Sequence, residues 1–194
     1  MRHLSWAVAV FAAVTLSSAA VVAQGLPLHS GVYLTVMDYL DDRLSLDGDC
    51  TSKNYKLELH DSLIGPFIHV TIGTDRQRYE KRDLYGLRAC DGRPYRFIDS
   101  HEYEIRESQP IALYTLLVRG GRHRIRRHFF SIGPAGAVVP LSRKNLKKAF
   151  PDNVFFQNAI DRTFHDDDEL LRYDDSAKTY LVNRLWLAST SRER

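Results

Sequence analysis

The sequence predicts an α+β fold: an antiparallel β meander of about eight strands, barrel-like or strongly curved, with a short N-terminal helix and C-terminal helices. Two periodicities support this prediction. From about residue 54 to 141, apolar and polar residues alternate in short runs divided by turn residues, which is typical of half-buried strands. From about residue 142 to 188, apolar residues recur three and four positions apart, which is typical of amphipathic helices.

Residues that start and stop helices refine the helical part of this prediction. Thr35 followed by Asp38 resembles a capping box and predicts the short N-terminal helix. Ser142 and Asn153 are suited to cap two further helices, because their side-chain oxygens can accept from the first free backbone N–H groups. A third C-terminal helix is expected to begin near Asp175.

Three signals refine the strands. Tyr79 to Cys90 is expected to form one long charged strand, and Asp91-Gly92 to turn it into a hairpin, since both residues tolerate positive φ. Ile111 to Val118 is apolar on both faces, which predicts a central strand. The segment Asp41 to Asp49 is polar and is expected to be a loop.

The N-terminus has the pattern of a secretory signal peptide. A basic start, Met1 to His3, precedes the apolar run Leu4 to Val14, and Val21 and Ala23 fit the −3/−1 rule of signal peptidase. The apolar run is too short to span a bilayer comfortably. We therefore expect residues 1–23 to be removed and residues 24–194 to form a single exported α+β domain, periplasmic or extracellular.

Composition restricts the classes of partner. The chain has 27 basic and 24 acidic residues, a balance that gives no general argument for nucleic-acid binding. No second apolar segment is long enough to span a membrane, so we expect no transmembrane segment in the mature chain. The expected partner is a ligand or a protein of the cell envelope, and the sequence does not specify an oligomeric state.

Cys50 and Cys90 are the two cysteines of the chain. An even number of cysteines in an exported protein most simply forms disulfides, because the compartment is oxidising. Neither residue lies in a Cys-x-x-Cys or Cys-His context, which argues against thiol chemistry. We therefore predict a Cys50–Cys90 disulfide.

A basic strand offers a candidate anion site. Arg122, Arg124, Arg126 and His128 alternate along the sequence, so in a strand their side chains point to one face. Guanidinium groups match phosphate, sulfate and carboxylate groups. The alternative is an outer sheet face on which these arginines pair with Glu102, Glu104 and Glu107 of other strands.

A second candidate site comprises Glu58, His60 and His69, which would share the polar face of a hairpin. Two imidazoles and a carboxylate can hold zinc or support hydrolysis, but the spacing matches no metal-ligand motif. The chain contains no nucleophile elbow, no H-E-x-x-H and no P-loop. We therefore predict no cofactor, no metal and no catalytic residue, and we favour a function that is not enzymatic.

Several motifs resemble a known family. They are Gly31-Val32-Tyr33-Leu34-Thr35, Tyr85-Gly86-Leu87-Arg88, Asp91 to Phe97, Val139-Pro140-Leu141-Ser142, Asn145 to Asn153 and Tyr173-Asp174. Together they are similar to a family of small exported proteins of unknown function from Gram-negative bacteria. The resemblance implies an exported bacterial domain, and because these motifs are turns, caps and a helix stop, it transfers no functional residue.

Three functional hypotheses follow. The leading one is an exported protein that binds a ligand or partner without catalysis. The second is an envelope hydrolase that uses His60, His69 and nearby acids. The third is a polyanion-binding module that works through Arg122, Arg124 and Arg126.

The signal peptide gives the first testable prediction. The exported protein should begin at Gln24, because the cleavage pattern ends at Ala23. An intact mass of the exported form that lacks residues 1–23 is the expected result. A mass that retains them would identify the segment as an uncleaved anchor.

Overall fold

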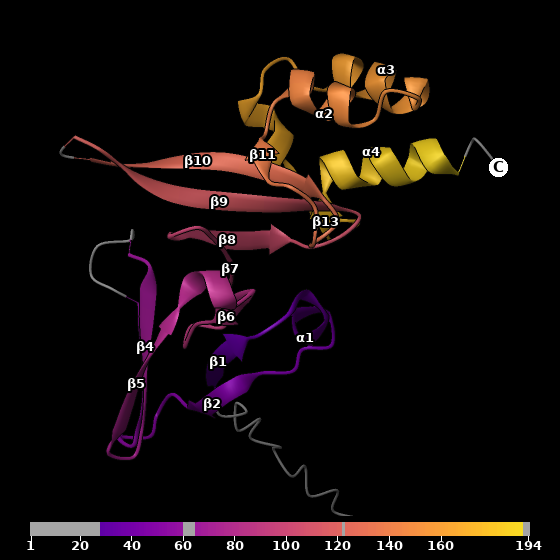
Figure 1. Cartoon of the computed structure of the whole chain (residues 1–194). Helices are drawn as coiled ribbons and strands as arrows, with labels where there is room; N and C mark the ends of the chain where they lie inside the picture. Colours follow the sequence, from indigo (N-terminus) through magenta and orange to yellow (C-terminus); the bar gives the residue numbers. More distant parts are fainter. Residues whose placement is uncertain (1–27, 60–64, 122, 192–194) are drawn as a thin grey trace, which may run out of the picture.

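The computed structural model describes residues 28–59, 65–121 and 123–191 (Figure 1). The predicted signal peptide, His60 and Arg122 lie outside the described residues. An eight-stranded antiparallel sheet dominates the structure, with the strand order β11-β10-β9-β8-β7-β6-β1-β2. Its strands are β1 (His29–Tyr33), β2 (Ser45–Asp49), β6 (Gly86–Arg88), β7 (Pro94–Ile98), β8 (His101–Glu107), β9 (Ile111–Gly120), β10 (His123–Ile132) and β11 (Val139–Pro140).

The remaining elements form smaller units. A second sheet, of three antiparallel strands, comprises β3 (Tyr55–Leu59), β4 (Phe67–Ile72) and β5 (Asp75–Glu80). The helices are α1 (Val36–Leu40), α2 (Arg143–Ala149), α3 (Val154–Thr163) and α4 (Leu181–Thr190), and two 3-10 turns are η1 (Lys81–Asp83) and η2 (Asp168–Leu171). A hairpin of β12 (Tyr173–Asp174) and β13 (Thr179–Tyr180) precedes α4.

The antiparallel β character is confirmed, but the barrel-like alternative is wrong, because the large sheet stays open between its edge strands β11 and β2. Strands β3 to β5 leave this sheet and stack on it. Their alternating apolar face, which includes Ile68 and Val70, packs against Val32, Leu87 and Phe97 of the large sheet. Stacking buries both apolar faces, whereas a closed barrel would require the two edges to pair.

The predicted strand from Tyr79 to Cys90 is interrupted at η1. There the side chain of Lys81 is completely buried and forms an ion pair with the nearly buried Glu102, with Nζ and Oε1 2.7 Å apart. The backbone N–H of Lys81 donates to the Pro66 carbonyl over 2.8 Å. A buried ammonium group has to be paired, and this pair lies where the chain passes from β5 to β6.

The expected loop between Asp41 and Asp49 contains strand β2. This strand pairs with β1, with His29 opposite Asp49 and Val32 opposite Ser45. The sequence does not predict this strand, because β2 is polar and lacks the alternating apolar residues that indicate a strand. Backbone pairing with β1 defines it instead.

The predicted disulfide is present between Cys50 and Cys90, whose Cα atoms are 5.6 Å apart. Cys50 follows β2 and Cys90 follows β6, and these strands flank β1 on its two sides. The bridge therefore closes the end of a three-strand unit. A loop of 40 residues stabilises the fold by about 4 kcal/mol at best in the chain-entropy model.

The helix caps lie at the residues that the sequence predicts. Thr35 and Asp38 form the capping box at α1, and the side chains of Ser142 and Asn153 accept from Asn145 N and Phe156 N at the starts of α2 and α3. The third C-terminal helix begins at Leu181 instead of near Asp175. The reason is a competing turn, in which the Asp174 carboxylate accepts from the backbone N–H groups of Ser176 and Ala177.

The C-terminal helices pack on one end of the large sheet. Their shared core joins Ile111, Leu113 and Phe130 of β9 and β10 to helical residues such as Phe156 and Ile160. Figure 1 shows these helices at the β10 end of the sheet and the three-stranded sheet at the β1–β2 end. Among the described residues, no helix is long and apolar enough to cross a membrane.

Asn183 fastens α4 to the start of β9. Its fully buried side chain accepts from Ile111 N and donates to Ile111 O, each over 2.9 Å, and also donates to the Gln109 carbonyl. The amide thus satisfies backbone groups that would otherwise be buried without a partner.

Replacement of Asn183 should therefore be costly. Asn183→Leu leaves the Ile111 N–H and C=O unsatisfied, and it should lower the free energy of unfolding by about 1–3 kcal/mol or more in urea titrations. The control Asn158→Leu, on the exposed side of α3, should change it by no more than about 0.5 kcal/mol. Equal effects of the two substitutions would contradict this role.

Candidate anion-binding groove

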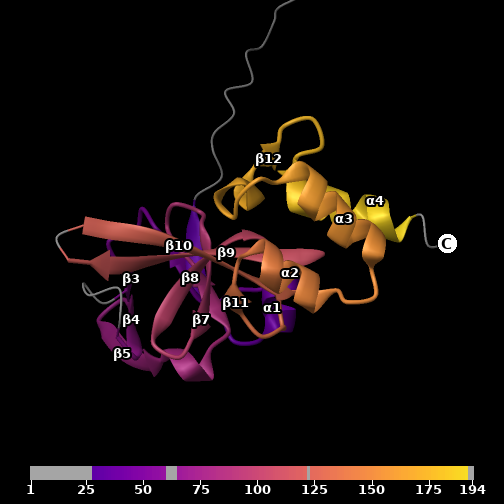
Figure 2. The ribbon, with the colours of Figure 1, turned by 90° about the horizontal axis from the view of Figure 1, so that it is seen from above.

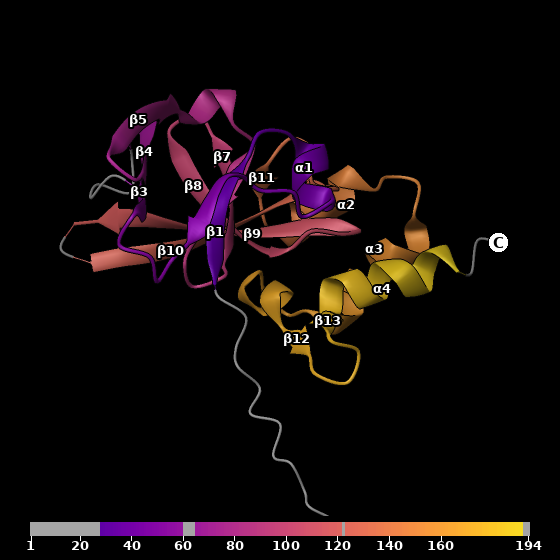
Figure 3. The ribbon, with the colours of Figure 1, turned by 90° about the horizontal axis from the view of Figure 1, so that it is seen from below.

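The large sheet has one face that is covered at its two ends and open between them. The three-stranded sheet packs on Val32, Leu87 and Phe97, and the C-terminal helices pack on Ile111, Leu113 and Phe130. Strand register places all six residues on the same face. The two covers lie apart from one another in Figures 2 and 3. The uncovered span lies over the middle of β7, β8, β9 and β10.

Two adjoining hollows, of about 230 and 380 Å³, occupy this span. We call them together the interlobe groove. Four residues line both hollows: Arg93, Glu104, Thr115 and Arg126. The first hollow is completed by Tyr95, Glu102, Leu117 and Arg124, and the second by Arg106, His128, Leu171 and Tyr180.

Strand register explains why these residues meet. Tyr95 lies opposite Glu104, Glu104 opposite Thr115, and Thr115 opposite His128, so one row of side chains crosses four strands. Residues directly opposite one another in antiparallel strands share a face. The row is mostly polar, and the covers meet it only at its margins, where Tyr95 packs against the core of the three-stranded sheet and Tyr180 lines the second hollow.

The acidic residues of the groove are already paired. Glu102 forms the ion pair with Lys81, and Glu104 Oε1 accepts from Arg106 Nη1 over 2.7 Å. The other Glu104 oxygen lies 3.8 Å from Arg93 Nη1. Arg106 is thus held at the groove wall by Glu104, whereas Arg93 is held mainly by Asp91, whose carboxylate accepts from Arg93 Nε over 2.7 Å.

Arg124 and Arg126 are different. Both side chains are exposed and line the groove from β10. Within residues 28–59, 65–121 and 123–191, no carboxylate oxygen lies within 4.0 Å of either guanidinium group. The alternative of a paired outer face therefore does not describe these two arginines. Arg122, the third member of the predicted row, lies outside the described residues.

Glu107, the third glutamate that the sequence offers as a partner of these arginines, makes structural hydrogen bonds instead. Its carboxylate accepts from the Thr179 hydroxyl and from Tyr180 N. Arg106 Nε in turn donates to the Tyr180 hydroxyl over 3.2 Å. The helical cover is therefore held to β8 at the wall of the groove.

His128 forms part of the groove floor. Burial lowers the pKa of its imidazole below the ordinary value; the negative charge of Asp168 opposes this effect, and the weaker effects of Arg106 and Arg126 add to the lowering. Its Nδ1 lies 3.3 Å from the Thr115 hydroxyl. The ring is therefore neutral at neutral pH and offers hydrogen bonds to a ligand.

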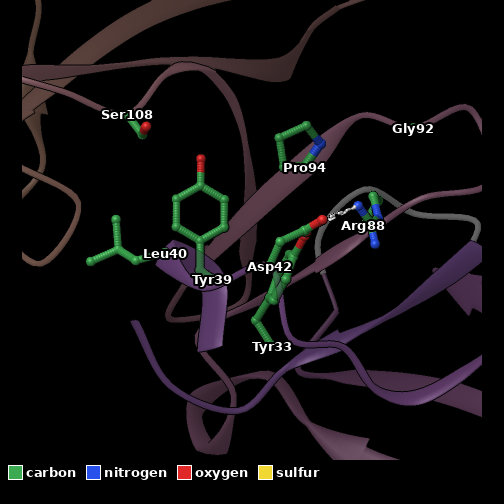
Figure 4. Close-up of a pocket in the computed structure, with 8 residues that line it drawn as sticks. All are labelled: Tyr33, Tyr39, Leu40, Asp42, Arg88, Gly92, Pro94 and Ser108. Atoms are coloured by element: carbon green, nitrogen blue, oxygen red, sulfur yellow. Dashed lines mark hydrogen bonds and ion pairs between the residues drawn. The ribbon is translucent and has the colours of Figure 1, made fainter. Parts of the chain in front are cut away.

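A further hollow, of about 260 Å³, lies on the opposite face beside α1 (Figure 4). Its charged groups satisfy one another: Arg88 Nη1 donates to both Asp42 oxygens, and the Tyr33 hydroxyl donates to Asp42 Oδ1 over 2.9 Å. Burial raises the pKa values of the Tyr33 and Tyr39 hydroxyls, which stay protonated. These contacts hold the end of α1 to the sheet, and the charged groups that line this hollow are paired with one another.

The predicted histidine site is only partly described. His69 on β4 lies opposite Glu58 on β3, and His60 lies outside the described residues. The Glu58 carboxylate forms ion pairs with Lys56 and Arg76, which hold its pKa below the ordinary value. In the described part of the chain, no group of three or more His, Cys, Asp or Glu residues could hold a metal ion.

Comparison of the chain with protein-family models, curated proteins and solved structures finds no match. The resemblance to small exported proteins of Gram-negative bacteria therefore stays a prediction.

The sequence predicts the groove wall that β10 forms, but it does not predict the opposing wall. The alternation of Arg124, Arg126 and His128 is visible within one strand. Arg93 and Arg106 join them only through the pairing of β7, β8, β9 and β10. Their separation of many residues along the chain leaves no local signal.

The environment of His128 predicts how stability depends on pH. The unfolded chain takes up the His128 proton near pH 6.5, whereas the folded chain resists it, so stability should fall as the pH drops below about 6.5. In His128→Asn, the decrease in the free energy of unfolding between about pH 7.5 and pH 5 should be smaller. An unchanged pH profile would contradict the burial of a neutral ring.

Proposed function

We propose that the chain is an exported, non-enzymatic binding domain that holds an anionic ligand in the interlobe groove. The observation that carries the proposal is the pair Arg124 and Arg126, two exposed guanidinium groups without an acidic partner among the described residues. They stand beside a groove whose own acids are occupied by other cations.

The groove has the chemistry that an anion needs. Guanidinium groups offer forked N–H donors that match carboxylate, sulfate and phosphate oxygens. Arg106 is oriented by Glu104 and Arg93 by Asp91, so little side-chain entropy is lost when a ligand binds against them. Thr115 and neutral His128 add hydrogen-bonding groups at the floor.

Export is supported by two features of different kinds. The first 23 residues have the order of a signal peptide, with a basic start, an apolar run and a small-residue cleavage site. The Cys50–Cys90 disulfide suits an oxidising compartment, since thiols in the cytosol are kept reduced. We therefore propose a periplasmic or extracellular location and an envelope ligand.

The proposal predicts the behaviour of matched charge variants on immobilised heparin. Arg124→Gln with Arg126→Gln should elute at clearly lower salt than the wild type, because two unpaired groove cations are lost. The control pair, Arg127→Gln with Arg162→Gln, removes the same charge from exposed residues outside the groove and should elute close to the wild type.

Both pairs should fold normally, since exposed substitutions cost no more than about 0.5 kcal/mol each. Equal shifts in the two pairs would show that retention follows net charge alone, and the groove would lose its role.

A further inference from the structure

We propose that β10 receives an extended acidic peptide as an added antiparallel strand, with the acidic side chains of the peptide against Arg124 and Arg126. The inference rests on the proposed anion site and names its ligand class. Its distinctive claim is that the ligand binds the backbone of β10 as well as the side chains.

One edge of β10 is uncovered for half its length. On one side β10 pairs with β9 throughout, from His123 opposite Gly120 to Ile132 opposite Ile111. On the other side β11 pairs only with Phe129 and Phe130. The half of the β9–β10 hairpin that carries Arg124 and Arg126 extends beyond the helices in Figures 1 and 2.

The direction of the free backbone groups follows from one hydrogen bond. Leu141 N donates to the His128 carbonyl over 2.9 Å, so the backbone of His128 faces the outer edge. Because N–H and C=O groups change sides at each residue of an antiparallel strand, those of Arg126 and Arg124 face the same edge. In the described part of the chain, these groups of Arg124 and Arg126 have no hydrogen-bond partner.

The same two residues thus carry unpaired backbone groups and unpaired charges. A residue directly opposite Arg124 or Arg126 on an added strand would exchange both backbone hydrogen bonds with it. Its side chain would emerge on the groove face, where opposite charges at facing positions stabilise the pairing. The added strand should therefore carry acids two residues apart.

The residue between these acids faces the other side of the sheet. There the side chain of Ile125 is 47% exposed and offers an apolar contact between the two arginines. An apolar residue of the peptide would cover it. The expected ligand pattern is acid–apolar–acid, as in Glu-Val-Glu.

A second copy of this chain is a poor occupant of the edge. Pairing of two β10 edges would bring arginines of one copy against arginines of the other, and facing like charges are destabilising. Cationic edge residues are a known protection against such pairing. The free edge of β10 therefore favours an acidic strand over the β10 edge of a second copy.

The experiment compares two acetylated, fluorescein-labelled peptides of about eight residues, each with Glu-Val-Glu at the centre, of which one carries a methyl group on the backbone nitrogen of both glutamates. Their charge is identical, but N-methylation removes the two backbone N–H groups that would face β10, because the residues opposite Arg124 and Arg126 turn their backbone groups to that strand. Fluorescence anisotropy with the full mature chain should show binding of the unmethylated peptide at least about tenfold tighter.

Variants at Arg126 separate the backbone from the charge. Arg126→Gln should weaken both peptides but keep the preference, whereas Arg126→Pro should remove the preference, since the N–H that proline lacks points away from β9. The comparison of the two peptides on the wild-type chain decides the matter even if Arg126→Pro does not fold.

The outcomes distinguish this inference from the proposed function. Equal affinity for the two peptides, or no binding of either while heparin is still retained through Arg124 and Arg126, would overturn strand addition and leave the anion site in place. Loss of both peptide and heparin binding would overturn both proposals.

Discussion

One long sheet face has to be shielded from water, and two separate parts of the chain cover it. The three-stranded sheet buries Val32, Leu87 and Phe97 at one end, and the C-terminal helices bury Ile111, Leu113 and Phe130 at the other. Burial of each such side chain contributes about 1.5–3 kcal/mol relative to exposure. Because neither cover spans the sheet, the middle row of Tyr95, Glu104, Thr115 and His128 lies between them as a groove wall and floor. The candidate site is thus a consequence of how the core is divided.

Ion pairs at the groove connect it to both covers. The buried Lys81–Glu102 pair lies where the chain passes from the three-stranded sheet to the large one. On the other side, Arg106 contacts Glu104 of the groove and Tyr180 of the helical cover. Loss of one partner of a buried pair leaves an uncompensated charge, so these acids are bound to structural roles. That leaves Arg124 and Arg126 with no acid to neutralise them among the described residues.

The sequence predicts those parts of the fold that depend on neighbouring residues. The caps at Thr35, Ser142 and Asn153, the alternation of the strands and the disulfide are all of this kind. The assignment of a strand to one sheet or the other is different, because β3 and β4 carry the same apolar–polar alternation that strands of a continuous meander would carry. The two cases differ only in the surface against which the strands pack. Here that surface includes Leu87 and Phe97, which come later in the chain. Sequence periodicity therefore predicts strands but not layers.

The site shows the same limit. A row within β10 is visible as alternating arginines, whereas the opposing wall of Arg93 and Arg106 requires the strand order. We propose that anions bind in this groove and not at other basic surfaces of the chain. The most direct measurement is an NMR titration of the ¹⁵N-labelled mature chain with a short heparin oligosaccharide. We expect the largest amide shifts at Arg93, Thr115, Arg124, Arg126 and His128. Shifts centred on Tyr39 and Arg88 of the opposite face, or spread evenly over exposed lysines and arginines, would contradict it.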